Sequence, residues 1–162
     1  MQRRKDRQRG FSLIELLIVV AIILIIASIA IPNLLSARMQ AHEAAAAEAI
    51  KTINTAQISY VSAYPTVGYA STLSALGGTN CAPPSPTSAC LISTQLASGV
   101  NNGYNFTITG VTGSPVASYE VIASPSVPNK TGRRYFCSFA DGQIRSSTTP
   151  IAACDYTVPP LQ

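Results

Sequence analysis

One carboxylate lies inside the most apolar part of the chain. Glu15 is the only ionisable side chain between Phe11 and Pro32. An ionised side chain costs about 2.5 to 3.5 kcal/mol at a bilayer centre on insertion scales, so carboxylates inside membrane segments usually serve a function. A cut between Gly10 and Phe11 would create an α-amino cation at Phe11, ~6 Å along a helix from Glu15. This spacing predicts a charge pair between Glu15 of one chain and Phe11 of a staggered neighbour.

Such a pair would mainly set the register between neighbouring helices. Two unit charges ~4 Å apart attract by about 4 kcal/mol at an effective dielectric of ~20, before desolvation is subtracted. An unpaired Glu15 in apolar surroundings is costly, so a wrong stagger would be rejected. The alternative is that Glu15 snorkels to water at the membrane surface.

A short basic segment precedes the apolar run. Five basic side chains and one acid lie before Phe11, whereas the rest of the chain carries six of each sign, so this segment supplies the whole net charge of +4. The positive-inside rule then predicts a cytoplasmic N-terminus and an external C-terminal part. We therefore identify no specific nucleic-acid site on the main domain. Gly10, the obvious small residue for cleavage, stands before the apolar run, so a cut there retains the apolar helix.

Residues 11–33 match the roughly 20 apolar residues of a membrane-spanning helix. The helix then continues with an apolar stripe at helical spacing and with polar side chains largely on other faces. The expected stripe is Leu35, Met39, Ala46, Ile50, Ile53 and Val61. The expected polar faces carry Arg38, Glu43, Glu48, Lys51 and Gln57. Pro32 predicts a helix kink, with the alternative that it merely marks the membrane exit. Pro65 predicts that the helix ends near Tyr64.

The second half of the chain has the pattern of a small sheet. Residues 65–102 are rich in Gly, Ser, Pro and Thr and read as a connector, with a short helical turn near residues 72–76. Strand-like runs follow at 104–109, 116–123, 134–139 and 143–146. Turns separate these runs, so the sheet is expected to be antiparallel, with a hairpin at Asp141-Gly142. The predicted fold class is α+β: a long N-terminal α-helix, half membrane-spanning and half amphipathic, packed on a small antiparallel β-sheet.

Four cysteines lie beyond the apolar run, at Cys81, Cys90, Cys137 and Cys154. An even count in a predicted extracytoplasmic domain indicates disulfides. Three pairings are open, and local order favours Cys81 with Cys90 and Cys137 with Cys154. The spacing lacks the paired Cys-x-x-Cys of zinc sites, and His42 is the only histidine, so we predict no metal or cofactor. His42 beside Glu43 has no further partner in the sequence, and no nucleophile or phosphate-loop motif is present, so we predict no enzyme.

The stretch Gly10-Phe11-Ser12-Leu13-Ile14-Glu15, with the apolar run after it, resembles the class III signal of type IV pilins and of the pseudopilins of type II secretion. The basic leader, the phenylalanine after glycine, the glutamate at the fifth mature position and Pro32 match that pattern. The motif covers about residues 1–35, and the rest is pilin-like in architecture. The resemblance implies cleavage between Gly10 and Phe11 by a prepilin peptidase, N-methylation of Phe11, and assembly by an ATP-driven inner-membrane platform. Thr52 stands where many type IVa pilins have a second helix proline, so a second bend is not implied.

These expectations give a domain plan and a function. The plan is leader 1–10, membrane and filament-core helix 11–33, amphipathic helix half 34–64, connector 65–102, and sheet with C-terminal disulfide loop 103–162. The resemblance implies a structural subunit of a type IV pilus that polymerises with copies of itself through its N-terminal helix, for motility, adhesion or DNA uptake. It implies residence in the bacterial inner membrane, with the leader cytoplasmic and the C-terminal domain periplasmic, and then in the extracellular pilus. The alternatives are a pseudopilin of a secretion system and a single-pass anchored binding or sensor domain that never polymerises.

Overall fold

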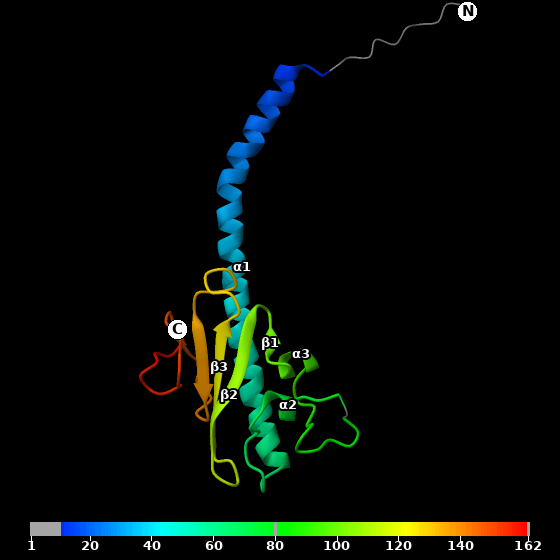
Figure 1. The fold of residues 1–162 in the computed structure, drawn as a ribbon, viewed down its shortest axis with the longest axis vertical. Coiled ribbons are helices and arrows are strands. Elements are labelled where there is room, and N and C mark those ends of the chain that lie inside the picture. The colour runs from blue at the N-terminus through cyan, green and yellow to red at the C-terminus, as the bar shows by residue number, and fades with distance from the viewer. Residues whose placement is uncertain (1–10, 80, 162) are drawn as a thin grey trace, which may run out of the picture. The chain divides into compact units, whose positions relative to one another are not determined.

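The structure is a computed structural model that describes residues 11–79 and 81–161. The predicted leader, with the Gly10 side of the cleavage bond, lies outside these residues. The chain divides into two compact units, Met1–Ala37 and Arg38–Gln162. The long helix α1 (Leu13–Ala63) contributes to both units (Figure 1).

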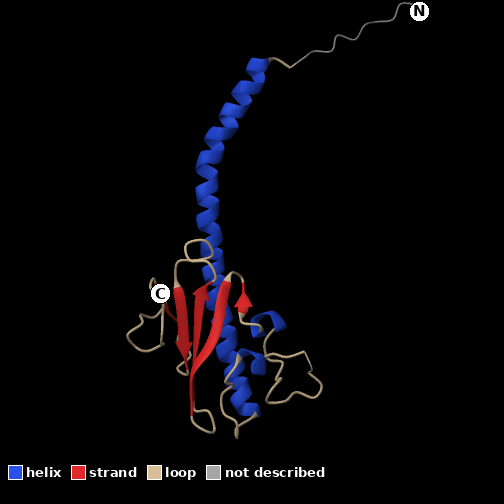
Figure 2. Cartoon of the chain, in the orientation of Figure 1, coloured by secondary structure: helices blue, strands red, loops and turns tan. Residues whose placement is uncertain are grey.

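Two one-turn helices and five strands follow α1. Their bounds are α2 (Leu73–Leu76), α3 (Thr94–Ala97), β1 (Val100–Asn101), β2 (Tyr104–Thr112), β3 (Ser118–Pro125), β4 (Tyr135–Phe139) and β5 (Arg145–Ser147). The strands form one antiparallel sheet in the order β1-β2-β3-β4-β5, which lies against the second half of α1 (Figure 2). The α+β fold class predicted from the sequence is confirmed, with a long N-terminal helix and a small antiparallel sheet.

The central strand β3 shows how the sheet covers the helix. Its side chains alternate strictly between buried and half-buried positions, as the period of two in a strand requires. Ala123 pairs with Phe106 of β2 on one side and with Phe136 of β4 on the other. A small residue thus stands between two buried aromatic rings, and the three side chains pack together in one row across the sheet.

The apolar stripe of α1 is shorter than the sequence predicts. Ala46, Ile50 and Ile53 are fully buried, as expected. Leu35, however, is 56 % exposed, and Met39 and Val61 are only half-buried.

Two polar side chains expected on other faces, Glu43 and Gln57, are instead buried on the core side of α1. Both fall at helical spacing from the apolar members of the stripe, and both find hydrogen-bond partners there. The prediction of their exposure was therefore wrong because burial follows position on the helix when the polar group is satisfied.

Gln57 pairs with the connector through both ends of its amide. Its Nε2 donates to the Ala70 carbonyl at 2.9 Å, and its Oε1 accepts from the Ala70 N–H at 2.8 Å. The fully buried amide of Gln57 is tolerated because both its nitrogen and its oxygen are hydrogen-bonded. Gln57 thus fixes the connector to α1.

Asn54 performs the same role toward the sheet. Its Nδ2 donates to Ser138 Oγ at 2.8 Å and to the Gly142 carbonyl at 3.3 Å, and its Oδ1 accepts from the Tyr119 hydroxyl at 3.2 Å. Burial, with a smaller contribution from nearby Tyr69 and Asp141, raises the pKa of Tyr119 to about 12. The tyrosine therefore stays neutral and keeps donating over the physiological range.

Glu43 ties α1 to the residues just before β4. Its Oε1 accepts from the backbone N–H groups of Arg133 at 2.8 Å and Arg134 at 3.2 Å, and its Oε2 accepts from Arg134 Nε at 2.7 Å. Burial by itself raises the pKa of Glu43, but the hydrogen bonds and the Arg134 charge outweigh it, so the net pKa lies below its usual value. The carboxylate is thus held ionised inside the fold.

The connector is more ordered than the sequence indicates. The helical turn expected near residues 72–76 is present as α2, with Thr72 Oγ1 accepting from the Ala75 N–H. Helix α3 and strand β1 were not predicted, since elements of four and two residues carry almost no periodicity. Gly68 has a positive φ of 85°, and a Cβ there would lie 2.2 Å from the Val116 carbonyl oxygen, so only glycine fits this close approach.

The hairpin signal at Asp141 is confirmed, but its loop is longer than two residues. Residues 140–144 join β4 to β5. Asp141 accepts from the Gln143 N–H at 3.0 Å and from Arg145 Nη2 at 2.8 Å. The buried Arg145 guanidinium also lies 4.4 Å from the centre of the Phe139 ring, so this corner is held by charge and by packing.

Both disulfides form between the cysteines that local order favours. Cys81 pairs with Cys90 in the connector, and Cys137 in β4 pairs with Cys154 in the C-terminal loop. Cys137 and Cys154 are buried, whereas Cys81 is exposed. The C-terminal pair is therefore part of the core, and the connector pair is closer to the surface.

Replacing both Cys137 and Cys154 by serine is expected to lower the free energy of unfolding by about 2 to 4 kcal/mol, because the unfolded chain gains the entropy of an open loop. Urea unfolding of the detergent-solubilised protein under non-reducing conditions measures this loss. The matched control is the Cys81→Ser, Cys90→Ser double variant, which opens a shorter loop and should lose about 0.5 kcal/mol less. An equal or larger loss in the control would contradict this ranking.

Candidate assembly segment

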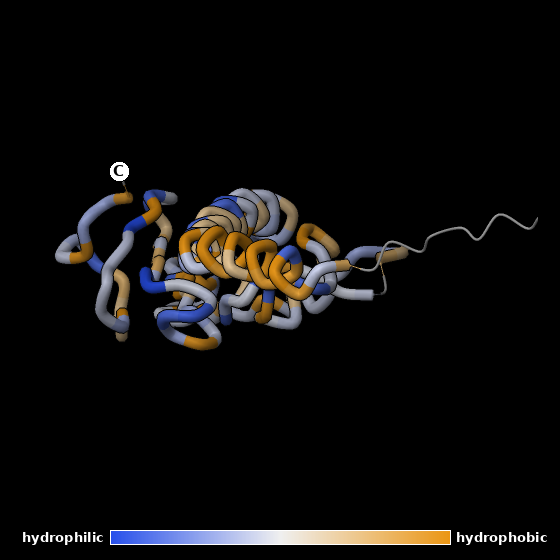
Figure 3. The backbone as a smooth tube through the Cα atoms, turned by 90° about the horizontal axis from the view of Figure 1, so that it is seen from above, coloured by the Kyte–Doolittle hydropathy of each residue, from blue (hydrophilic) through white to orange (hydrophobic). Residues whose placement is uncertain are grey.

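The first half of α1 exposes apolar side chains around its whole circumference. Its large apolar residues between Leu13 and Leu35 are 47–79 % exposed. Consecutive residues of a helix point ~100° apart, so the described residues of the chain leave every face of this stretch uncovered. Among the described residues, α1 is the one helix long and apolar enough to cross a membrane, and a long run of it is coloured as hydrophobic in Figure 3. This exposed stretch, residues 11–35, is called the assembly segment below.

Four polar side chains interrupt the assembly segment: Ser12, Glu15, Ser28 and Asn33. Ser28 Oγ donates to the Ile25 carbonyl at 2.7 Å. Glu15 Oε2 accepts from the Ser12 backbone N–H at 3.0 Å. The Ser28 hydroxyl and the Glu15 carboxylate are thus bound within the helix, as groups facing hydrocarbon must be.

The Glu15 contact is one half of a capping box. Ser12 precedes the helix, Glu15 is the third helical residue, and its carboxylate reaches back to the free amide of Ser12. The positive end of the helix dipole favours a negative charge at this place. Ser12 was not among the residues predicted to be functional, although the spacing Ser-x-x-Glu ahead of an apolar run is itself a capping signal.

The structure brings Glu15 and Phe11 to the same end of α1. The Phe11 side chain is 84 % exposed, and its main chain enters the first turn of the helix through Ser12. Pairing of Glu15 with an α-amino group at Phe11 of a neighbour, cleavage after Gly10 and N-methylation of Phe11 remain predictions. Pro32 lies inside α1 with helical residues on both sides, and its kink also remains a prediction.

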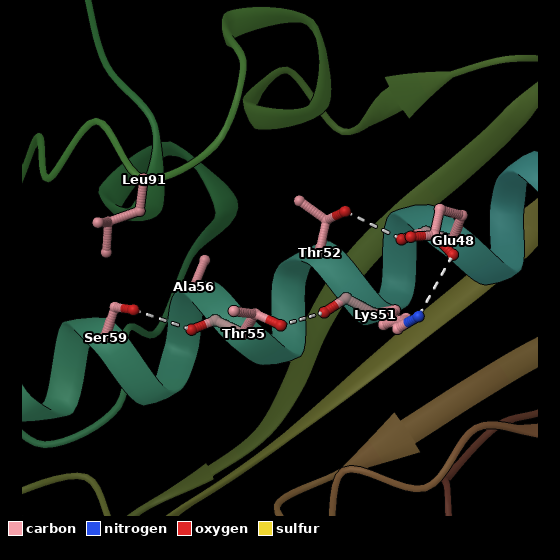
Figure 4. A pocket seen from close by; sticks show the side chains of 7 residues that line it. All are labelled: Glu48, Lys51, Thr52, Thr55, Ala56, Ser59 and Leu91. Carbon is pink, nitrogen blue, oxygen red and sulfur yellow. Dashed lines mark hydrogen bonds and ion pairs between the residues drawn. The ribbon is translucent and has the colours of Figure 1, made fainter.

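A hollow on the outer face of the second half of α1 has no feature of a ligand site. Its hydroxyl side chains each donate to the carbonyl four residues earlier (Figure 4): Thr52 to Glu48, Thr55 to Lys51 and Ser59 to Thr55. The ion pair between Lys51 and Glu48 spans 3.9 Å and is well exposed. Because these donors are already engaged, the hollow is an ordinary solvated helix face.

The part of the chain that the structure describes contains no cluster of three metal-ligating side chains. The four cysteines are engaged in disulfides. His42 lies half-buried on α1 beside the Glu43 carboxylate, which is bound by Arg133 and Arg134. This arrangement offers no built site for a cofactor.

The fold and the assembly segment define the class of protein. It is an α+β protein with an exposed apolar helix of membrane length, and a carboxylate caps the start of that helix. Residues 5–31 match the model of the prokaryotic N-terminal methylation motif. The chain is 47 % identical over 62 residues to the type IV major pilin protein PilA of Myxococcus xanthus, covering 38 % of this chain and 28 % of that protein. It is 63 % identical over 35 residues to the type IV wide pilus major component PilA4 of Thermus thermophilus, covering 22 % of this chain and 27 % of that protein.

These similarities confirm the resemblance to type IV pilins over the matched part of the chain. The match spans little more than a quarter of each curated relative. No solved structure matches the chain. Both relatives are named as components of pili, which are structural assemblies.

Proposed function

We propose that this chain is the structural subunit of a type IV pilus. A prepilin peptidase removes residues 1–10, Phe11 is N-methylated, and an inner-membrane platform assembles the mature subunits with the help of ATP. Before assembly the leader is cytoplasmic and the C-terminal domain periplasmic, and afterwards the subunit is extracellular. The filament serves motility, adhesion or DNA uptake.

The observation that carries this proposal is the assembly segment, which is exposed on all sides and carries one carboxylate at its start. Such a surface must be covered by lipid or by other helices, because water contact would cost about 1.5 to 3 kcal/mol for each large apolar side chain. Lipid tails and apolar side chains are similarly apolar, so transfer from bilayer to filament has little hydrophobic driving force. An external energy source and a specific register contact are then both needed, and Glu15 supplies the second.

N-terminal analysis of the native protein tests the processing step. Fibres sheared from intact cells should yield a chain that begins at N-methylated Phe11, while the membrane fraction should contain the same mature species. A chain that begins at Met1, or one that begins beyond Ala30 and lacks the apolar helix, would contradict the proposal.

The shear fraction also separates the alternatives. A pseudopilin at native expression should leave no fibres outside the cell, although its mature N-terminus is the same. An anchored binding domain should leave no fibres and should tolerate loss of Glu15. A surface pilus subunit should be abundant in the sheared fibres.

A further inference from the structure

Half of the basic side chains in the second unit, Arg38–Gln162, have no acidic partner among the residues that the structure describes. Lys51, Arg134 and Arg145 form ion pairs with Glu48, Glu43 and Asp141. Arg38, Lys130 and Arg133 form no ion pair with any residue in 11–79 or 81–161, and all three are exposed. These three residues are called the basic end below.

The three cations lie at the same end of the unit, where α1 enters it. A methyl group placed on Gly103 would lie 3.0 Å from Thr131 Cβ and 3.8 Å from His42 Nδ1, so the loop that carries Thr131 lies close to His42 of α1. Arg133, two residues further, donates its N–H to Glu43 of α1. Figure 1 shows the segment between β3 and β4 beside α1 at this end.

Arg38, the first residue of the second unit, belongs to the basic end as well. It precedes His42 by four residues and so lies on the same helix face, one turn earlier. The nearest acid on this part of α1 is Glu43, and its two oxygens already accept three hydrogen bonds from Arg133 and Arg134. The field at this end is therefore positive.

We propose that the basic end binds the anionic phosphate headgroups of the bilayer that holds the assembly segment. The inference rests on the proposed membrane anchoring. Arg38 follows Pro32 by six residues, which is ~9 Å of helix, about one Debye length at physiological salt. Arg and Lys side chains reach several Å further, and each cation close to an anionic leaflet strengthens binding about fivefold.

A second copy of the chain is a less suitable partner for the basic end, because the acids of the unit that lie outside its ion pairs are already bound. Glu120 accepts from the Cys154 N–H, and Asp155 accepts from Thr157, so each is already bound within its own chain. Phosphate headgroups, by contrast, are present wherever the apolar helix is inserted. The basic end then holds the second unit at the membrane surface until the subunit leaves the bilayer.

Acylation of lysines in reconstituted full-length protein tests this proposal. Vesicles of phosphatidylcholine alone and vesicles with ~30 % phosphatidylglycerol receive the same protein and an amine-reactive acetylating reagent. Mass spectrometry then follows Lys130 in the basic end and Lys51, which is 69 % exposed on the other face of α1, as an internal control. Lys130 should react about threefold to fivefold more slowly on the anionic vesicles, Lys51 should be unchanged, and about 1 M salt should abolish the difference.

A pair of variants sharpens the test. Arg38→Gln with Arg133→Gln should reduce the protection of Lys130 by at least half, whereas Lys51→Gln should leave it unchanged. These three side chains are exposed, so the substitutions should not unfold the domain.

The outcomes separate this inference from the anchoring on which it rests. If Lys130 is acetylated at the same rate on both kinds of vesicle, and the protein floats with both, headgroup binding is overturned and membrane anchoring is left intact. Absence of flotation with either vesicle overturns anchoring, and headgroup binding with it. Protection that is equal on both vesicles and grows with protein density indicates contact between copies of the chain and overturns the lipid assignment.

Discussion

Glu15→Ala is expected to leave the precursor processed and membrane-inserted, while surface filaments fall by at least about tenfold. The substitution removes the carboxylate that can meet the α-amino group of a neighbouring Phe11. Raw attraction at ~4 Å is about 4 kcal/mol at a dielectric of ~20, and even a third of it after desolvation corresponds to about tenfold in an association constant. Immunoblots of the membrane and sheared-fibre fractions measure both quantities in the same cells.

Glu15→Gln separates two roles of this side chain. The carboxylate caps the helix by accepting from the Ser12 N–H at 3.0 Å. A glutamine oxygen can still accept that hydrogen bond, but it carries no charge. If the register depends on charge, the glutamine variant should lose surface filaments to the same extent as the alanine variant.

Ser28→Ala is the matched control within the assembly segment. Its hydroxyl donates to the Ile25 carbonyl of its own helix and has no free donor for a neighbour. Filament yield should remain near that of the wild type. Normal filaments from Glu15→Ala cells, with mature protein at its usual amount, would show that the charge pair does not set the register.

The features that local sequence encodes were predicted well. The end of α1 at Ala63 follows from Pro65, which disfavours helical geometry in the residue before it. The antiparallel sheet follows from runs that only turns separate. The third strand was predicted at 116–123 and is found at Ser118–Pro125. A shift of two residues keeps the same side chains on the core face, because the period of a strand is two.

The polar members of the core could not be predicted in the same way. Glu43 is bound by Arg133 and Arg134, about ninety residues away in the sequence, and Asn54 by Tyr119 and Ser138. A helix pattern shows which positions face inward, but it does not show whether a distant partner will satisfy a polar group there. The assembly segment is the opposite case, because its lack of packing partners among the described residues follows from its long and almost purely apolar sequence.

Glu43→Ala is expected to lower the free energy of unfolding by about 2 to 4 kcal/mol. The substitution leaves the Arg133 and Arg134 N–H groups without their acceptor and releases the Arg134 side chain. The cost is below that of a fully buried ion pair because the Arg134 side chain is 42 % exposed and can be hydrated. Urea unfolding followed by tyrosine fluorescence measures it, since the chain has no tryptophan.

Glu48→Ala is the matched control for Glu43 on the same helix. Its side chain is 71 % exposed, and its distance of 3.9 Å to Lys51 is that of a weak surface pair. The expected change is about 0.5 kcal/mol or less. Similar losses for the two variants would show that the contacts of Glu43 do not stabilise the fold.

The free energy of unfolding of the wild type should fall more steeply with decreasing pH than that of the Glu43→Gln variant. Burial raises the pKa of Glu43, but its hydrogen bonds and the Arg134 charge lower it further, so the folded pKa lies below the unfolded value of about 4.5. The unfolded state therefore binds the proton first, and the stabilisation present above about pH 4.5 is lost as the pH falls through the folded pKa. Glutamine has no proton to gain, so its curve of unfolding free energy should be flatter between about pH 5 and pH 3. Parallel curves for the two proteins over this window would mean that Glu43 is not held ionised by the fold.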